Sequence, residues 1–128
     1  EHYGEAPETV GEIIRCIYES LAMKFRWTVE QLEKVSGKEL PVINMMGGGS
    51  KAEILCQFVA NACGRKVVAG PDEATAIGNI TVQLISIGAA SSLDEAKNIM
   101  ASASKMREYL PQNHEEWDVK YQECIINK

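Results

Sequence analysis

Apolar residues recur every three or four positions in the first part of the chain, which places them on one face of a helix. The stripe comprises Val10, Ile13, Ile14, Ile17 and Leu21, and continues less regularly through Phe25, Val29, Leu32 and Val35. Thr9 and Glu12 have the spacing of a capping box, in which each side chain accepts a bond from a backbone N–H at the helix start. Gly37 favours a C-terminal stop. The pattern predicts one helix or two between Thr9 and Gly37, and we favour one helix with a bend near Trp27.

The next segment predicts a strand, a glycine turn and a helix. The short apolar run 41–46 is bounded by proline and glycine, which suits a buried strand. Gly47, Gly48 and Gly49 interrupt it, and Ser50 with Glu53 has the spacing of a second capping box. The helix that follows is expected to end at Gly64. Its predicted apolar face comprises Ile54, Leu55, Phe58, Val59 and Ala62.

The second half of the chain predicts one more short strand, 66–69, and then three helices. Gly70-Pro71 is a turn signal, after which a helix capped by Asp72 runs to about residue 87. That helix is apolar on nearly every side, so we expect it to be buried centrally. Ser92 with Glu95 caps a shorter helix, and Asn113 begins a last amphipathic one. Its apolar side is expected to contain Trp117, Tyr121, Cys124 and Ile125.

The predicted order is therefore helix, strand, helix, strand and three helices, an α/β arrangement rich in helix. Two strands do not form an adequate sheet alone, so a partner strand is expected from a segment outside the chain or from association. The chain also begins with Glu1 rather than Met. We therefore expect a fragment of a longer protein.

Composition narrows the class of protein. The 128 residues suit one domain, and 45% hydrophobic with 24% charged residues is ordinary for a globular protein. A net charge of −5 argues against nucleic acid as the main partner. No apolar run is long enough for a membrane span, and no signal peptide opens the chain. Cys56 and Cys63 fall on one predicted helix about 10 Å apart, too far for a disulfide. We expect all four cysteines to be buried free thiols in a reducing cytoplasm.

Gly47, Gly48, Gly49 and Ser50 are the candidate ligand-binding residues. Glycines between a strand and a helix let a ligand approach the backbone, and place amide groups and a positive helix end where a phosphate or an adenine could sit. The alternative is a tight turn with no ligand. Neither a Rossmann fingerprint nor a Walker loop fits the spacing. Lys51 is expected to be solvated.

A second candidate segment is 69–80, Ala-Gly-Pro-Asp-Glu-Ala-Thr-Ala-Ile-Gly-Asn-Ile. Glu73 and Thr75 are polar groups at a helix start, and Ala74, Ala76 and Gly78 are small enough for close backbone approach. Helix capping and packing are the favoured interpretation of these residues. We find no nucleophile–base pair, paired carboxylates or metal-ligand spacing, so no catalytic residue and no metal ligand is expected in this chain.

The run INMMGGGSKAEILCQFVANACGRKVVAGPDEATAIGNITVQLI resembles the C-terminal portion of the FGGY carbohydrate kinases. The likeness extends from about Ile14 to Tyr109. Its specific parts are GGGS before a helix ending in ACG, and the later AGPDEATAIGNI. The Gly78-Asn79 pair is closer to the rhamnulokinase branch than to glycerol kinase or xylulokinase.

This resemblance implies an actin-like, ribonuclease-H-like fold of two domains that clamp ATP between them. Residues 1–128 would form the C-terminal part of the second domain, with the N-terminal domain absent. The glycines would lie beside the adenosine and α-phosphate of ATP, Gly48 foremost and Ser50 more weakly. Ala52 departs from the Asn or Ser common in relatives, which puts a side-chain contact there in doubt.

The implied reaction transfers the γ-phosphoryl group of MgATP to the 1-hydroxyl of L-rhamnulose in the cytoplasm. The catalytic aspartate and the main Mg²⁺ contacts would lie outside this chain, so the chain alone is expected to be inactive. The expected partners are ATP, the sugar and the N-terminal domain. One alternative is another FGGY kinase of the fuculose, xylulose or glycerol type. The other is a non-catalytic binding or oligomerisation domain.

Overall fold

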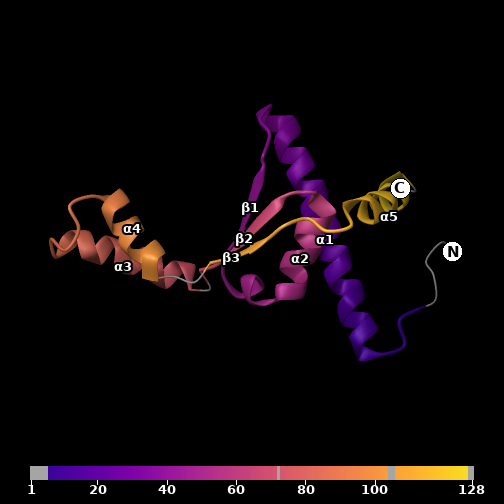
Figure 1. The fold of residues 1–128 in the computed structure, drawn as a ribbon, viewed down its shortest axis with the longest axis horizontal. Helices are drawn as coiled ribbons and strands as arrows, with labels where there is room; N and C mark the ends of the chain where they lie inside the picture. The colour runs from indigo at the N-terminus through magenta and orange to yellow at the C-terminus, as the bar shows by residue number, and fades with distance from the viewer. Residues whose placement is uncertain (1–5, 72, 104–105, 127–128) are drawn as a thin grey trace.

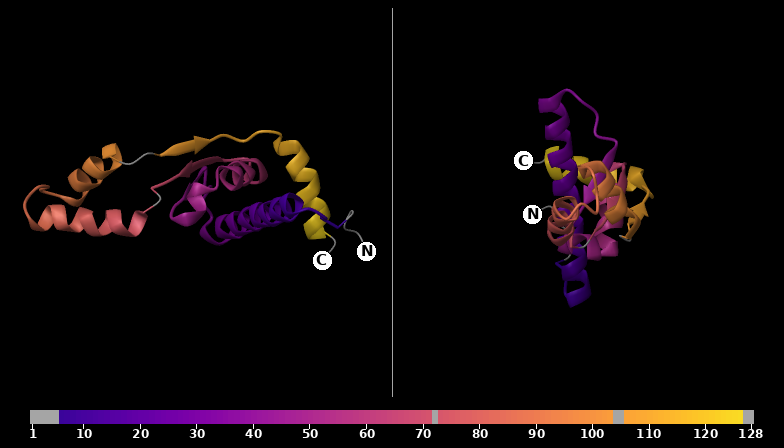
Figure 2. Two further views of the ribbon diagram at one scale, coloured as in Figure 1. Left: turned by 90° about the horizontal axis from the view of Figure 1, so that it is seen from below. Right: turned by 90° about the vertical axis from the view of Figure 1, so that its left-hand side faces the viewer.

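The computed structural model describes residues 6–71, 73–103 and 106–126. The three-stranded sheet has the order β1-β2-β3, with β1 parallel to β2 and β3 antiparallel to β2 (Figure 1). Helix α2 lies against the sheet and α1 packs on α2, while α3 and α4 extend away from the sheet (Figures 1 and 2). In chain order the elements are α1 (Val10–Ser36), β1 (Val42–Met45), the 3-10 helix η1 (Gly48–Lys51), α2 (Glu53–Cys63), β2 (Lys66–Ala69), α3 (Ala74–Ser86), α4 (Leu93–Ala103), β3 (Arg107–Tyr109) and α5 (His114–Ile126).

Helix α1 is one continuous helix whose ends are those predicted from the sequence. The Thr9 hydroxyl accepts from the Glu12 N–H at 3.2 Å, and the Glu12 carboxylate accepts from the Thr9 N–H at 2.9 Å. Gly37 closes the helix in the left-handed conformation, with φ 65°. Because these caps involve residues three or four apart, they form wherever the helix forms.

The apolar stripe of α1 is much less covered than its periodicity suggests. Val10 is 73% exposed and Ile17 is 50% exposed, whereas only Ala22 and Val29 are buried in this helix. The helix packs on α2 through Ala22 and the partly buried Tyr18 and Phe25. The predicted helix is confirmed, but most of its apolar face has no cover in the part of the chain that the structure describes.

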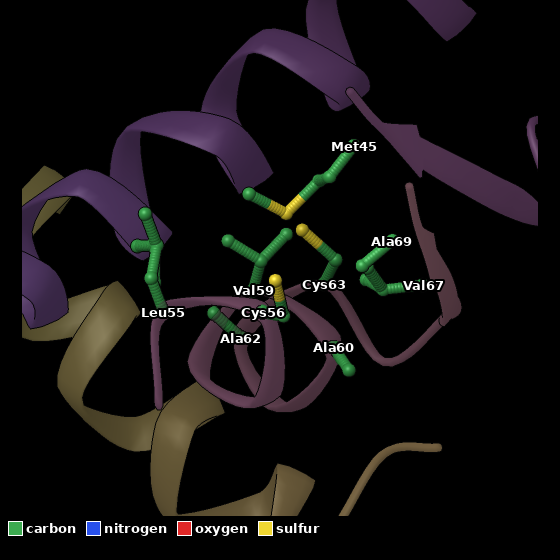
Figure 3. Close-up of a cluster of buried hydrophobic side chains, with 10 residues drawn as sticks. Met45, Leu55, Cys56, Val59, Ala60, Ala62, Cys63, Val67 and Ala69 are labelled. Atoms are coloured by element: carbon green, nitrogen blue, oxygen red, sulfur yellow. The ribbon is translucent and has the colours of Figure 1, made fainter. Parts of the chain in front are cut away.

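Helix α2 is the centre of the core, where its side chains meet α1 on one side and the sheet on another (Figure 3). Val59 and Ala60 are fully buried, and Met45 and Val67 reach the same cluster from β1 and β2. One residue of the predicted apolar face is misplaced, since Ile54 is 60% exposed. The other members of the core are Ala22 of α1 and Leu55, Cys56, Ala62, Cys63 and Ala69.

A third strand, β3, was not predicted. Its three residues, Arg-Glu-Tyr, show no apolar alternation, so no sequence pattern marks them. Val67, Val68 and Ala69 of β2 pair with Tyr109, Glu108 and Arg107 of β3. The expectation that a partner strand must come from outside the chain was therefore wrong, because the chain itself returns to the sheet after α4.

The prediction that α3 is buried centrally was also wrong. Ile80 is 44% exposed, Val82 is 59% exposed, and Thr81 is its one residue among the buried side chains of the described chain. Helix α3 packs on α4, and the pair projects from the sheet (Figure 1). The helix ends at Ser86, close to the predicted limit near residue 87, and Gly88 follows with a left-handed φ of 74°. Its predicted cap, Asp72, lies outside the described residues. Apolar composition specified a helix that needs cover, but did not specify what covers it.

The cysteines divide into two classes. Cys56 and Cys63 are buried, as expected, whereas Cys16 and Cys124 are exposed, and all four are free thiols. The prediction was wrong for Cys16 and Cys124 because each lies on a helix face that no described element covers.

Candidate functional site

Two turns that the sequence predicted separately meet at one edge of the sheet. Met45 pairs with Ala69 at the carboxyl ends of the parallel strands β1 and β2. The Gly70 N–H donates to the Met45 carbonyl at 2.8 Å, and the Gly47 N–H donates to the Pro71 carbonyl at 3.4 Å. The glycine loop therefore lies beside the start of the 69–80 segment. In α/β sheets, ligands bind outside the carboxyl ends of parallel strands.

Ser50 shapes the glycine loop instead of capping α2. Its N–H and its hydroxyl both donate to the Gly47 carbonyl, at 3.0 and 2.6 Å, and the residue is fully buried. Helix α2 begins at Glu53, after Ala52, with no side-chain cap. The predicted Ser50–Glu53 capping box was wrong because η1 takes up Gly48–Lys51 and turns the Ser50 hydroxyl inward.

The three glycines border open space. A Cβ built on Gly47, Gly48 or Gly49 would meet no atom of the described residues within 4 Å. Gly47 alone of the three has a left-handed φ, 76°, which side chains other than glycine rarely adopt. Within the described ranges, no hydrogen bond occupies the N–H of Gly48 or Gly49. The loop therefore presents bare backbone and two available donors at the sheet edge.

The charged and small residues around the loop are largely solvated. The Lys51 ammonium lies 3.6 Å from the Glu73 carboxylate, with side chains 57% and 76% exposed. This agrees with the prediction of a solvated lysine. Glu73 stands at the cap position of α3 but its side chain makes no capping bond. Gly78 borders open space, and Thr75 and Ala76 are exposed, so packing within the described chain does not explain these three residues.

Arg107, at the start of β3, is a site residue that the sequence did not reveal. Its guanidinium donates to the Ser50 carbonyl at 2.9 Å and lies 3.3 Å from the Glu53 carboxylate. The separation from Ser50 is 57 residues along the chain. No local pattern could have indicated this contact, because it depends on the return of the chain to the sheet.

The thiol of Cys56 lies beneath the loop and has low reactivity. Its Sγ is 3.6 Å from the Ser50 carbonyl oxygen and 3.9 Å from that of Gly49. Burial raises the pKa of the Cys56 thiol, and the positive charge of Arg107 opposes the shift only in part. A thiol of raised pKa is a poor nucleophile at neutral pH. Its contribution is packing and a weak bond to the loop carbonyls.

The described residues bring together no cluster of three His, Cys, Asp or Glu side chains that could hold a metal ion. The arrangement offers backbone donors and bare glycine surface, which suit binding and not acid–base chemistry. Separately, no described helix is both long enough and apolar enough to cross a membrane.

Comparison with known proteins gives a consistent picture. The sequence model of the FGGY family of carbohydrate kinases, C-terminal domain, matches residues 4–87. A rhamnulokinase of Bacteroides thetaiotaomicron is 41% identical over 115 residues, covering 90% of this chain and 24% of that protein. A rhamnulokinase of Lactiplantibacillus plantarum is 32% identical over 124 residues, covering 95% of this chain and 25% of that protein. A third, from Halalkalibacterium halodurans, is 35% identical over 111 residues, covering 87% and 24%. The chain thus spans about a quarter of the length of these relatives.

Proposed function

Because the chain belongs to the FGGY family of carbohydrate kinases, through its C-terminal domain, we propose that it supplies the adenosine side of the ATP site of a sugar kinase. That domain is part of the actin-like ATPase fold. The five α-helices and small three-stranded sheet of the described residues are this chain's contribution to that fold. Gly47, Gly48 and Gly49 hold the nucleotide by close backbone approach. Gly48 is foremost because, among the described residues, no atom fills the space beside it and no hydrogen bond occupies its N–H. Ser50 contributes by holding the loop.

The observation that carries this proposal is the bare glycine loop at the carboxyl edge of β1 and β2. Gly48 and Gly49 have no left-handed φ, and a Cβ on either would meet no atom of the described residues, so neither packing nor backbone conformation requires glycine at these two positions. A flat ligand lying on the backbone would explain their identity. ATP supplies the phosphoryl group when bound; the residues described here bind and orient its adenosine end and exclude water from it.

The substrate is proposed from the relatives. Three relatives are named rhamnulokinase, which supports phosphorylation of L-rhamnulose at its 1-hydroxyl. Phosphoryl transfer of this kind depends on positioning and charge neutralisation between closing domains. The catalytic base, the Mg²⁺ contacts and most of the sugar pocket belong to the other three quarters of such a kinase. An FGGY kinase for fuculose, xylulose or glycerol is the alternative within the family.

We further propose that residues 1–128 are the C-terminal part of the second kinase domain and work packed against the remainder in the cytoplasm. The uncovered apolar faces of α1 and α3 support this, since exposed apolar patches mark interaction surfaces. Val10, Ile17, Val82 and Ile87 are each at least half exposed. A non-catalytic binding or oligomerisation domain would also need such a surface, so activity decides between the two.

The test is Gly48→Ala in the kinase that contains this chain. The added methyl meets no atom of the described chain and Gly48 has no left-handed φ, so the melting temperature should not fall. We expect the KM for ATP to rise about tenfold, equivalent to roughly 1.4 kcal/mol of binding, with little change in the KM for sugar. Gly11→Ala, also beside open space but on α1, is the matched control. A folded Gly48→Ala enzyme with wild-type KM for ATP would refute the nucleotide role.

A second measurement tests the reaction itself. ATP consumption should depend on L-rhamnulose more strongly than on L-fuculose, D-xylulose or glycerol. Preference for one of these others moves the protein to another branch of the family. No sugar-dependent turnover with any of them would favour the non-catalytic alternative. The 128-residue chain alone should show no turnover above background.

A further inference from the structure

Arg107 connects the glycine loop to the strand that returns after α3 and α4. The pairing of Ala69 with Arg107, and of Met45 with Ala69, places Arg107 in the row that ends the sheet beside the loop. From there its Nη2 donates to the Ser50 carbonyl at 2.9 Å, and its Nη1 lies 3.3 Å from Glu53 Oε1. One guanidinium thus bridges the last part of the loop and the first turn of α2.

A guanidinium suits these two acceptors better than any other side chain does. Its planar fork directs several N–H donors at fixed angles, so it can hold a carbonyl and a carboxylate together. The Ser50 carbonyl belongs to a fully buried residue whose N–H and hydroxyl both bond to Gly47. The chain of contacts therefore runs from Arg107 through Ser50 to Gly47, the residue with the left-handed φ.

We propose that Arg107 is a positioning residue that fixes the shape of the glycine loop through the Ser50 carbonyl. Its consequence for nucleotide binding rests on the proposed function, but its effect on the loop does not. The Arg107 contacts described above are to the Ser50 carbonyl and the Glu53 carboxylate. Arg107 acts by limiting the conformations of the loop before a ligand arrives, which lowers the ordering cost of binding.

The first experiment is done without nucleotide, on the chain labelled with 15N-glycine. Arg107→Gln should shift the amide signals of Gly47, Gly48 and Gly49 and leave Gly11 and Gly37 in place. Arg107→Lys should restore the signals in part, because one ammonium can serve one acceptor but not reproduce the fork. The matched control is Arg65→Gln, which removes another long-range arginine contact, 2.9 Å to Glu33, away from the loop. Unshifted loop glycines in a folded Arg107→Gln chain would overturn the proposal.

The second experiment is steady-state kinetics in the kinase containing the chain. Arg107→Gln should raise the KM for ATP about tenfold while kcat changes by less than about threefold, the split expected for lost preorganisation of binding.

If Arg107→Gln does not fold, the amide signals of Arg107→Lys and Glu53→Gln test the positioning role instead. Each should shift the loop signals by a smaller amount, and unchanged signals in both would refute the role.

The two proposals fail in different ways. If Arg107→Gln shifts the loop signals but Gly48→Ala leaves the KM for ATP unchanged, the positioning role stands and the nucleotide role fails. If Gly48→Ala raises the KM for ATP but Arg107→Gln leaves the loop signals unchanged, the nucleotide role stands and the positioning role fails.

Discussion

The guanidinium of Arg26 lies over the ring of Tyr121, with its Cζ 4.0 Å from the ring centroid. Arg26 also donates to Glu30 at 3.0 Å and to Asp118 at 2.6 Å, and the Tyr121 hydroxyl donates to Glu30 at 2.7 Å. Tyr121 is 3% exposed. Burial, together with this bond to Glu30, raises the pKa of the Tyr121 phenol. The cluster fastens α5 to α1, and through the Arg26 bond to the Ala62 carbonyl it reaches α2.

Replacement of Arg26 by Met should therefore destabilise the chain substantially. It removes the partner of Glu30 and Asp118 and the cation over Tyr121, with an expected loss of about 2–4 kcal/mol in the free energy of unfolding. Urea denaturation measures it. Arg15→Met is the control, because the ion pair of Arg15 with Glu19 on the same helix is exposed and worth less than about 0.5 kcal/mol. The Arg15 Cζ also lies 6.0 Å from the Phe58 ring centroid, at the outer limit of a cation–π contact. Equal effects of the two substitutions would contradict the role of the cluster.

Gly64 and Gly37 both end helices in the left-handed conformation, with φ 63° and 65°, but only Gly64 is crowded. A Cβ on Gly64 would lie 2.9 Å from the His114 ring, whereas a Cβ on Gly37 would meet nothing within 4 Å. Gly37→Ala should cost about 1 kcal/mol, from backbone conformation alone. Gly64→Ala should cost more, because His114 must move and strain its bond to the Asn61 carbonyl.

Thermal unfolding of both variants, of His114→Ala and of the double variant His114→Ala/Gly64→Ala separates the cost of backbone conformation from the cost of the clash with the His114 ring. Relative to His114→Ala, the added Gly64→Ala change should cost no more than Gly37→Ala does in the wild type. If Gly64→Ala lowers the melting temperature no more than Gly37→Ala does, the His114 ring moves aside without a loss of stability.

The cysteines should react in two groups. Burial raises the pKa of Cys63 to about 11, and Cys56 is fully buried with a raised pKa as well. At about pH 8 only roughly one Cys63 in a thousand is thiolate, which is the reactive form. A thiol reagent should therefore label Cys16 and Cys124 in the folded chain, and all four thiols in denaturant. Mass spectrometry of the labelled peptides identifies the sites. Rapid labelling of Cys63 under native conditions would contradict this assignment.

The capping box of α1 should make stability fall in acid. Bonds from the backbone N–H groups of Thr9 and Glu8 lower the pKa of Glu12 below its ordinary 4.5. Because the folded-state pKa is the lower one, the stabilisation is present above about pH 4.5 and is lost as the pH falls through the folded value. Glu12→Gln should be less stable than the wild type near neutral pH and approach it in acid. Urea midpoints across this range test it.

Glu39→Gln serves as the control for this titration, since Glu39 is an exposed residue in the loop before β1. Near neutral pH its urea midpoint should match that of the wild type, because surface substitutions of this kind have small effects. A constant difference between Glu12→Gln and the wild type at every pH would mean that the carboxylate charge contributes nothing to the cap.

The elements that the sequence predicted correctly depend on neighbours along the chain. Thr9 with Glu12 and Ser92 with Glu95 form caps between residues three apart, and Gly37 and Gly64 end their helices where the periodicity stops. The strands β1 and β2 follow from short apolar runs between turn residues. The position of the glycine loop between β1 and a helix follows in the same way.

The features that the sequence did not predict depend on residues far apart in the chain. Strand β3 exists because the chain returns to β2, and Arg107 reaches Ser50 only through that return. Ser50 has a capping spacing, yet η1 turns its hydroxyl inward.

Burial shows the same division. The apolar sequences of α2 and α3 both specify helices that need cover. Tertiary packing buried α2 between α1 and the sheet, whereas α3 packs mainly on α4 and keeps exposed apolar residues. The sequence by itself thus determined the caps, the helix limits and the glycine loop, because these need bonds over a few residues. Only the tertiary structure decided which faces are covered and which side chains hold the loop, because those contacts join segments brought together by folding.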